Sequence, residues 1–317
     1  WWYPHGVYRS PKRMRGQSPS HAGELAVQER VGVHERAERS AAHSIRDHLI
    51  EQHRDFYTLL PMLFIGFVDA DGKPWASILT GTPGFSHALD ERRLRINALP
   101  LPGDPLAAVL RDGLSVGCLG LQWETRRRNR VNGLVSDIDG DGFTLDVIHA
   151  FGNCPKYIQK REVVAALEPG AALLETRTVL NADDTALIAR ADTFCIATAV
   201  ADGADVSHRG GKAGFLRLEE EGALSWPDYT GNNFFNTLGN IEANSAAGLL
   251  IPDWETGRVL QMTGSAEIRW DVEARAGLPG AKRVMAFKPT QVRSLSNIIP
   301  DRWALIESSP FLDRLKD

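Results

Sequence analysis

Hydrophobic and polar positions along the chain predict more strand than helix. Residues 34–59 are charged, with apolar residues near helical spacing, which predicts a helix. The apolar segments 62–68 and 75–80 predict two strands, because the turn sequence Asp-Ala-Asp-Gly at 69–72 lies between them. Further strands are predicted at 93–96, 115–123, 133–138, 143–148, 194–200, 214–218, 247–251, 258–263 and 266–270. Short strands separated by Gly and Asp turns favour small β-barrels over a doubly wound sheet.

This pattern occurs twice. The motif Trp-Glu-Thr stands at 123–125 and again at 254–256, and a glycine follows the Thr by eight positions in both copies. Upstream, Ser77 and Ser207 each precede a Gly-Phe pair by seven positions. In both matches the second copy follows the first by about 130 residues, which is the length of a domain and not of a solenoid repeat. The sequence therefore predicts two copies of one fold, arranged as a dimer fused into one chain.

The repeat divides the chain into an N-terminal arm (1–34), a first half (35–175) and a second half (176–317). Segment 155–166 is interpreted as a helix, and the break Glu-Pro-Gly at 168–170 as the linker between the halves. The expected fold class is mainly β, with flanking helices around two tandem barrels that form a pseudo-dimer.

Composition narrows the function classes. The chain has 317 residues, 43% of them hydrophobic and 24% charged, as in folded globular proteins of about two domains. The net charge of −4 gives no general attraction to nucleic acid or to anionic membranes, and no apolar run reaches the roughly 20 residues of a membrane helix. Cys118, Cys154 and Cys195 form no CxxC pair, which fits a cytoplasmic protein, and no histidine spacing indicates a metal site.

The first twenty residues mix aromatic and basic side chains without the apolar core of a secretory signal. They are interpreted as an extended arm that packs on a partner subunit and so permits a homodimer. A disordered or vector-derived tail is the alternative.

Candidate chemistry lies where the two halves differ. The second half carries the amide-rich segment DYTGNNFFNTLGN at 228–240, where the first half has a shorter apolar stretch at 99–104. A helix start near Asn232 would offer free backbone N–H groups to an anion. The first half is therefore expected to hold only a degenerate version of this site.

The hairpin before this segment differs in the same way. The second half reads DVSHRGGK at 205–212, whereas the first half has WASILTGT at 75–82. Cationic donors beside two glycines suit a phosphate group, and Arg209 offers the planar fork that matches phosphate oxygens. The alternative is a solvated turn, but its pairing with the amide-rich segment favours a binding site.

Four segments together resemble a known family: SHRGG at 207–211, PDYTGNNFFNTLGN at 227–240, TGRVLQMTGSAEIRW at 256–270 and FGNCPKYIQ at 151–159. They are similar to the pyridoxamine 5′-phosphate oxidase-related, FMN-binding split-barrel proteins, and in particular to the tandem forms found fused to ferredoxin reductase-type modules. The resemblance implies a six-stranded antiparallel split barrel in each half, with FMN in the cleft between the barrels.

The resemblance also implies which residues contact the cofactor, although it assigns no catalytic residue. From the second half these are Ser207, His208, Arg209, Tyr229, Thr230, Asn232, Asn233 and Asn236, and from the first half Asn153, Lys156 and Tyr157. Simpler members of the family have a basic pair where this chain has two asparagines at 232 and 233. Phosphate affinity is therefore expected to depend more on Arg209.

The function expected from the resemblance is that of an FMN-dependent oxidoreductase acting on a small molecule, with NAD(P)H or a redox partner protein exchanging the electrons. Oxidation of pyridoxamine phosphate itself is disfavoured, because the full basic complement is missing. Two alternatives stay open: a non-catalytic flavin-binding or electron-transfer module that serves a separate reductase, and a split barrel that binds heme.

Three further features have a purely structural interpretation as well as a functional one. Cys154 precedes a proline at a predicted helix start, where a thiolate would be reactive, but a structural cysteine is favoured. The arginine-rich run 126–130 is interpreted as a solvated hairpin tip or a salt-bridged interface patch, and not as a phosphate or nucleic-acid site. His208 is a proton donor to the flavin or a phosphate or backbone contact.

Overall fold

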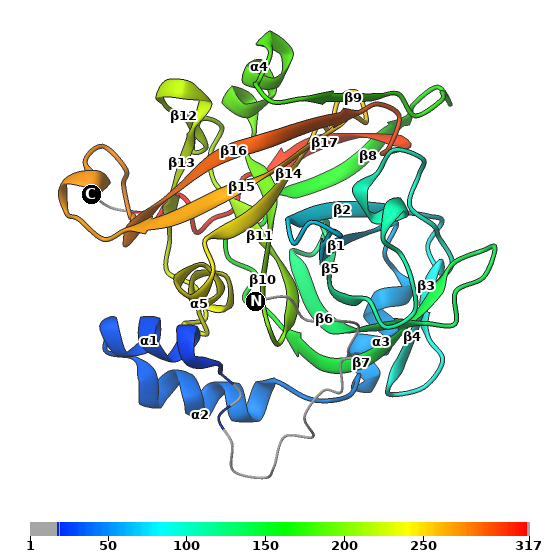
Figure 1. Ribbon diagram of the computed structural model, residues 1–317, viewed down its shortest axis with the longest axis horizontal. Coiled ribbons are helices and arrows are strands. Elements are labelled where there is room, and N and C mark those ends of the chain that lie inside the picture. The colour runs from blue at the N-terminus through cyan, green and yellow to red at the C-terminus, as the bar shows by residue number, and fades with distance from the viewer. Residues whose placement is uncertain (1–17, 19, 316–317) are drawn as a thin grey trace.

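The computed structural model describes residue 18 and residues 20–315, so the first part of the expected arm, residues 1–17 and 19, lies outside the described residues (Figure 1). Two antiparallel sheets make up most of the described chain. The first contains β1 (Met62–Val68), β2 (Pro74–Thr80), β3 (Ser86–Ala88), β4 (Arg93–Ile96), β5 (Ser115–Gln122), β6 (Arg127–Ser136) and β7 (Phe143–Gly152). The second contains β10 (Thr193–Val200), β11 (Gly203–Gly210), β12 (Arg217–Leu218), β13 (Leu224–Asp228), β14 (Ala246–Pro252), β15 (Val259–Arg269) and β16 (Arg283–Leu295).

The two sheets have the same strand order. The first runs β2-β1-β5-β6-β7-β4-β3 and the second β11-β10-β14-β15-β16-β13-β12, so that strands nine numbers apart occupy the same place. A short strand, β9 (Leu174–Arg177), pairs with β16, and β8 (Lys160–Ala166) forms a separate ribbon with β17 (Asp301–Glu307). The mainly β class with two tandem antiparallel barrels is confirmed.

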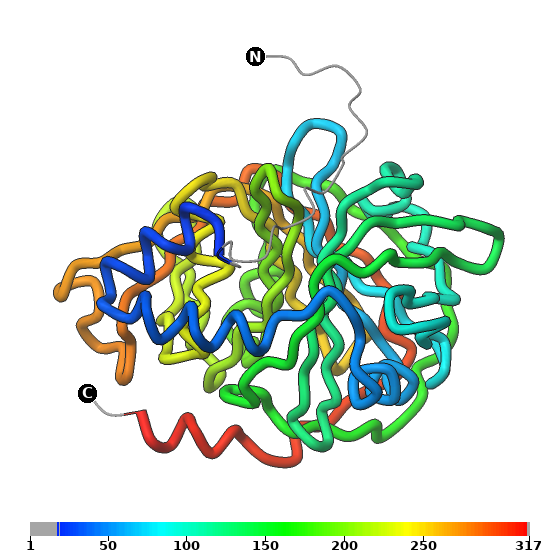
Figure 2. The backbone as a smooth tube through the Cα atoms, turned by 90° about the horizontal axis from the view of Figure 1, so that it is seen from below, coloured from blue at the N-terminus to red at the C-terminus, as the bar shows by residue number. Residues whose placement is uncertain are grey.

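Helices flank the sheets at matching positions. They are α1 (Ala22–Arg30), α2 (His34–Ser44), α3 (Glu51–Thr58), α4 (Ala182–Arg190) and α5 (Asn236–Ala243). Helix α3 precedes β1 as α4 precedes β10, and the 3₁₀ turn η1 (Pro105–Ala108) stands between β4 and β5 as α5 stands between β13 and β14. Figures 1 and 2 show α1 and α2 running side by side along the second half, where α1 packs on α5. Among the described residues, no helix is long and apolar enough to cross a membrane.

The halves meet through reciprocal contacts. Strand β5 packs on β11, and its counterpart β14 packs on β2, while β1 and β10 lie against each other. A third hydrophobic core, between those of the two halves, fills this interface. At its centre the two copies of the repeated tryptophan, Trp123 and Trp254, meet edge to face with their ring centroids 4.9 Å apart. The repeated motif is therefore a packing corner on which the two halves meet.

The repeated glycines have a local cause. Ladder register shifts between Asn132 and Gly133 in β6 and between Thr263 and Gly264 in β15, so both glycines stand at a β-bulge. A Cβ at either position would lie 2.1 Å from a carbonyl oxygen of the neighbouring strand, which only glycine avoids. The strands predicted at 258–263 and 266–270 are thus one bulged strand, β15.

Three other expectations were wrong. Segment 155–166 is not a helix, because 160–166 forms β8 and pairs with a strand near the C-terminus. The predicted helix 34–59 is two helices, α2 and α3, separated by extended chain that pairs at Arg46 with Ala150. Each sheet contains more than six strands among the described residues, because short strands extend it at one edge.

Candidate functional site

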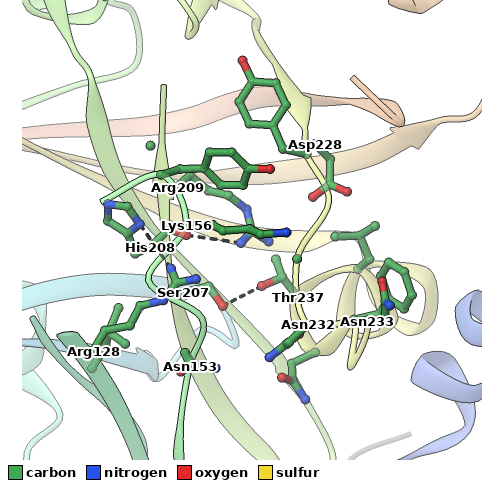
Figure 3. Close-up of a pocket in the computed structure, with 18 of the residues that line it drawn as sticks. Arg128, Asn153, Lys156, Ser207, His208, Arg209, Asp228, Asn232, Asn233 and Thr237 are labelled. Carbon is green, nitrogen blue, oxygen red and sulfur yellow. Dashed lines mark hydrogen bonds between the residues drawn. The ribbon is translucent and has the colours of Figure 1, made fainter. Parts of the chain in front are cut away.

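A cavity lies between the two halves and is built by both (Figure 3). The second half contributes β11, the loop 228–235 and the start of α5, and the first half contributes β6 and the loop 153–157. Ten of the eleven residues predicted to contact a cofactor line this cavity: Asn153, Lys156, Tyr157, Ser207, His208, Arg209, Tyr229, Asn232, Asn233 and Asn236. Thr230 is not among the lining residues, and its carbonyl oxygen accepts a hydrogen bond from the Tyr157 hydroxyl at 3.1 Å.

Ser207 joins three elements at the floor of the cavity. Its hydroxyl oxygen accepts hydrogen bonds from Thr237 Oγ1 of α5, at 2.8 Å, and from Arg130 Nη2 of β6. Arg130 also donates to Asn236 Oδ1 at 3.2 Å and forms a buried ion pair with Asp205 at 3.0 Å. The side chain of Arg130 therefore crosses from the first half and fixes β11 against α5.

For the arginine-rich run 126–130 the interpretation as a solvated tip was wrong, whereas the alternative of a salt-bridged interface patch agrees with the ion pairs of Arg126 with Glu307 and of Arg130 with Asp205. Only Arg126 stands in the turn, where it forms an ion pair with Glu307, and β6 begins at Arg127. Because side chains alternate between the faces of a strand, Arg128 and Arg130 point to the same side, and both line the cavity. These two residues, together with Thr237, are the functional candidates that the sequence analysis missed.

Arg128 and Arg209 concentrate positive charge at the cavity. Burial, reinforced by the neighbouring arginines, lowers the pKa of Arg128 to about 10, and burial also lowers the pKa of Arg209. Among the described residues, no carboxylate forms an ion pair with either side chain, although Asp228 lines the same cavity and is paired with Arg283. The Nε atoms of both arginines are buried without a hydrogen-bond partner. Two guanidinium groups with unsatisfied donors in one cavity favour an anionic ligand there.

His208 is held as a neutral hydrogen-bond donor. Arg128 Nη1 lies 3.2 Å from His208 Nδ1, and since a guanidinium can only donate, Nδ1 accepts and the ring proton is on Nε2. Burial, followed by the charges of Arg128 and Arg209, holds the pKa of His208 well below its usual range. His208 is therefore uncharged at neutral pH, and its buried Nε2–H lacks a partner within the described part of the chain.

The amide-rich loop ends in an uncapped helix. Asn232 Oδ1 accepts a hydrogen bond from the Phe234 amide at 3.1 Å, and Asn233 and Phe235 have left-handed backbones with φ of 66° and 61°. For phenylalanine this conformation is strained. Helix α5 starts only at Asn236, four residues later than predicted, and no described side chain caps it. Its first N–H groups are thus free beside the cavity.

The first half covers the cavity with an aromatic contact. The ring of Tyr157 lies 4.9 Å from that of Tyr229, and burial raises the pKa of Tyr157 to about 12. Lys156 Nζ lies 5.7 Å from the centre of the Phe311 ring, and Figure 3 shows Lys156 and Arg209 pointing into the same space. Cys154 is half-buried beside this loop, but the predicted helix start there is wrong because 155–157 is a turn.

Comparisons with known proteins relate the second half to one family. The family model described as pyridoxamine 5′-phosphate oxidase matches residues 181–302. None of the curated proteins matches the chain.

Solved structures similar to this chain cover little more than a third of it. HupZ of Group A Streptococcus is 19% identical and covers 35% of this chain and 96% of its own, with a TM-score of 0.30. A FAD-binding protein of Mesorhizobium loti is 13% identical and covers 39% and 99%, with a TM-score of 0.29. A putative pyridoxamine 5′-phosphate oxidase of Lactobacillus delbrueckii is 19% identical and covers 37% and 94%, with a TM-score of 0.30.

Proposed function

We propose that this chain, whose residues 181–302 match the family model of pyridoxamine 5′-phosphate oxidase, binds a flavin, FMN, in the cavity between its halves and acts as an FMN-dependent oxidoreductase. When bound, FMN supplies the electron or hydride transfer, while the protein supplies binding and orientation. The substrate is a small molecule, and NAD(P)H or a redox partner protein exchanges the electrons.

The cavity fits the chemistry of FMN at both ends. Arg209 and the uncapped start of α5 offer cationic and N–H donors to the phosphate, which carries up to two negative charges. The apolar side chains of Leu119, Phe215 and Leu238 line the same cavity and give a flat ring a surface to pack on.

Arg128 and His208 then face the ring system. Both are donors, and the buried Nε2–H of His208 is free to bond a ring nitrogen or carbonyl oxygen. His208 orients the ring and does not serve as an acid, because its lowered pKa keeps the imidazole neutral at pH 7 and loss of the Nε2 proton would leave an imidazolate anion.

The observation that carries the proposal is the pair of half-buried arginines from opposite halves, Arg128 and Arg209, which line one cavity and neither of which has a carboxylate ion-pair partner among the described residues. Two such cations in one cavity favour an anionic ligand.

Flavin titration of the full-length apoprotein tests the proposal. We expect FMN to bind at least tenfold more tightly than riboflavin, because only FMN carries the phosphate. Arg209→Ala should weaken FMN binding at least tenfold and leave riboflavin binding unchanged, since a lost hydrogen bond to a charged group costs about 1.5–3 kcal/mol. Arg127→Ala is the control for the loss of an arginine near the site, because Arg127 stands on β6 beside Arg128 but packs over Phe56 and does not line the cavity.

Failure of the wild type to take up FMN, FAD or riboflavin would overturn the proposal. If FMN binds and NAD(P)H is not oxidised, the flavin site stands and NAD(P)H is excluded as the direct electron donor. The electrons would then come from a redox partner protein, as they also would in an electron-transfer module.

A further inference from the structure

We propose that helix α1 is a working part of the flavin site and that Glu24 is a positioning residue, which acts through Asn236 on Arg130. The inference rests on the proposed FMN site and adds a segment from outside both barrels to it. Glu24 itself does not line the cavity between the halves.

Helix α1 is attached to the segment that builds the cavity. Gly23 and Gly239 bring α1 and α5 into backbone contact, since a Cβ on Gly23 would lie 2.1 Å from the Gly239 carbonyl oxygen. Two hydrogen bonds flank this contact: Gln28 Nε2 donates to the Phe234 carbonyl at 3.1 Å, and His21 Nε2 lies 2.8 Å from Asn240 Oδ1. The loop and the start of α5 are thus held from outside by one helix.

Between these contacts Glu24 sets the orientation of one amide. Glu24 Oε1 accepts a hydrogen bond from Asn236 Nδ2, so Asn236 Oδ1 is turned toward Arg130 Nη1, 3.2 Å away. The opposite orientation would place the NH₂ group of Asn236 against the guanidinium, donor against donor. Glu24 therefore makes Asn236 an acceptor for Arg130, which in turn holds Ser207 on the cavity floor.

The position of the Glu24 carboxylate is unfavourable for its charged form, because the group is buried. Glu24 is 5% exposed, and burial raises its pKa although His21 and Asn236 partly offset the effect. Its second oxygen accepts the His21 amide at 2.8 Å, which completes a capping box at the start of α1. Both oxygens are thus engaged, one inside α1 and one on the flavin-site segment.

A double-mutant cycle on FMN affinity tests the relay in the full-length protein. Glu24→Ala should raise the Kd for FMN about tenfold, and Asn236→Ala by a similar factor. In the Asn236→Ala background, Glu24→Ala should have no further effect, because residues in one network are not additive. Glu24→Gln keeps one acceptor oxygen for Asn236 and turns its NH₂ group toward the His21 amide, so it should bind FMN within threefold of the wild type although the capping box of α1 is weakened. Glu29→Ala, on the exposed face of the same helix, is the matched control and should leave the Kd unchanged.

Equal FMN affinity in Glu24→Ala and the wild type would overturn the inference, as would independent, multiplying effects in the double variant. If Glu24→Ala does not fold, Glu24→Asp carries the same test, because it keeps the charge and withdraws the carboxylate from Asn236 by one methylene. No FMN binding by the wild type would instead overturn the proposed function, so the two failures are distinguishable.

Discussion

The folded protein lowers the pKa of His53 far below that of a free histidine. His53 is buried beside the first-half sheet, and burial, followed by the charges of Arg46 and Arg127, lowers its pKa to about 4. In the unfolded chain the pKa of His53 stays near 6.5, so the unfolded state binds the proton more readily than the folded state. His53 therefore contributes stability that is fully present above pH 6.5 and is lost as the pH falls toward 4.

Replacing this histidine should flatten the acid side of the stability profile. Between pH 7 and pH 5 we expect the wild type to lose on the order of 1 kcal/mol more unfolding free energy than His53→Gln. Urea unfolding at the two pH values measures the difference. Parallel losses in the two proteins would show that His53 does not titrate as its surroundings imply. His208, whose pKa is also lowered, remains in both proteins and cancels in the comparison.

Residues of the cavity differed in how well the sequence predicted them. His208, Arg209 and Asn232 stand out because polar side chains replace the apolar ones of the other copy, and they all line the cavity. Arg128 and Arg130 were missed although Val259 and Gln261 stand at the corresponding positions of the second half, since a basic run fits a solvated turn as well as a strand. Only their alternation about Asn129 indicates a strand face, and only the partner half explains their burial.

Glycines at equivalent positions let the two sheets touch. A Cβ on Gly248 of β14 would lie 2.4 Å from the Pro74 carbonyl oxygen of β2, and one on Gly117 of β5 would lie 2.8 Å from Asp205 Cα of β11. Both obstacles are backbone atoms of the opposite half, so neither can turn aside. The close approach is a property of the paired elements, and it needs glycine on both sides of the interface.

Substitution of these two glycines should separate stability from cofactor binding. Gly117→Ala and Gly248→Ala should each lower the unfolding free energy by about 1–3 kcal/mol through overpacking. Only Gly117→Ala should also weaken FMN binding, because it displaces Asp205, the ion-pair partner of Arg130. Chemical unfolding and FMN titration measure the two effects.

Gly140→Ala is the control for this pair, since a Cβ there meets no atom within 4 Å. Equal loss of FMN affinity in Gly117→Ala and Gly248→Ala would contradict the assignment of the cavity to the β11 side of the interface.

Strands that pair with the next strand along the chain were easier to predict than strands whose partner lies far away in the sequence. The hairpin of β1 and β2 follows from alternating apolar residues and a turn sequence, and it forms as predicted. Strand β8 was missed because its partner β17 lies far along the chain and their ribbon exposes Val163 and Val164. No one-sided apolar pattern marks such a strand, so the segment resembled a helix.

At the scale of the whole molecule, the two-fold arrangement creates two equivalent sites, of which one is closed. Ser77 corresponds to Ser207 in the strand registers, and Gln261 stands on β15 where Arg130 stands on β6. At the second site Asp104 Oδ2 accepts hydrogen bonds from Ser77 at 2.6 Å and from Gln261 at 3.0 Å. Its other oxygen accepts the Leu106 amide and so caps η1, the counterpart of the uncapped α5.

Asp104 thus supplies from within the chain the acceptor oxygens that the first site lacks. We expect one FMN per chain, because a phosphate at the second site would meet a buried carboxylate whose donors are already engaged. Absorbance of the loaded protein, measured against its concentration, gives the ratio directly. Asp104→Ala should lower the unfolding free energy by about 1–3 kcal/mol, since it leaves Ser77 and Gln261 without their acceptor. It should keep the ratio at one, because Arg293, the arginine beside Asp104, already donates to the Gly103 carbonyl oxygen at 3.2 Å. Two flavins per wild-type chain would mean that the halves are functionally equivalent and that the contrast between Arg130 and Gln261 does not select the site.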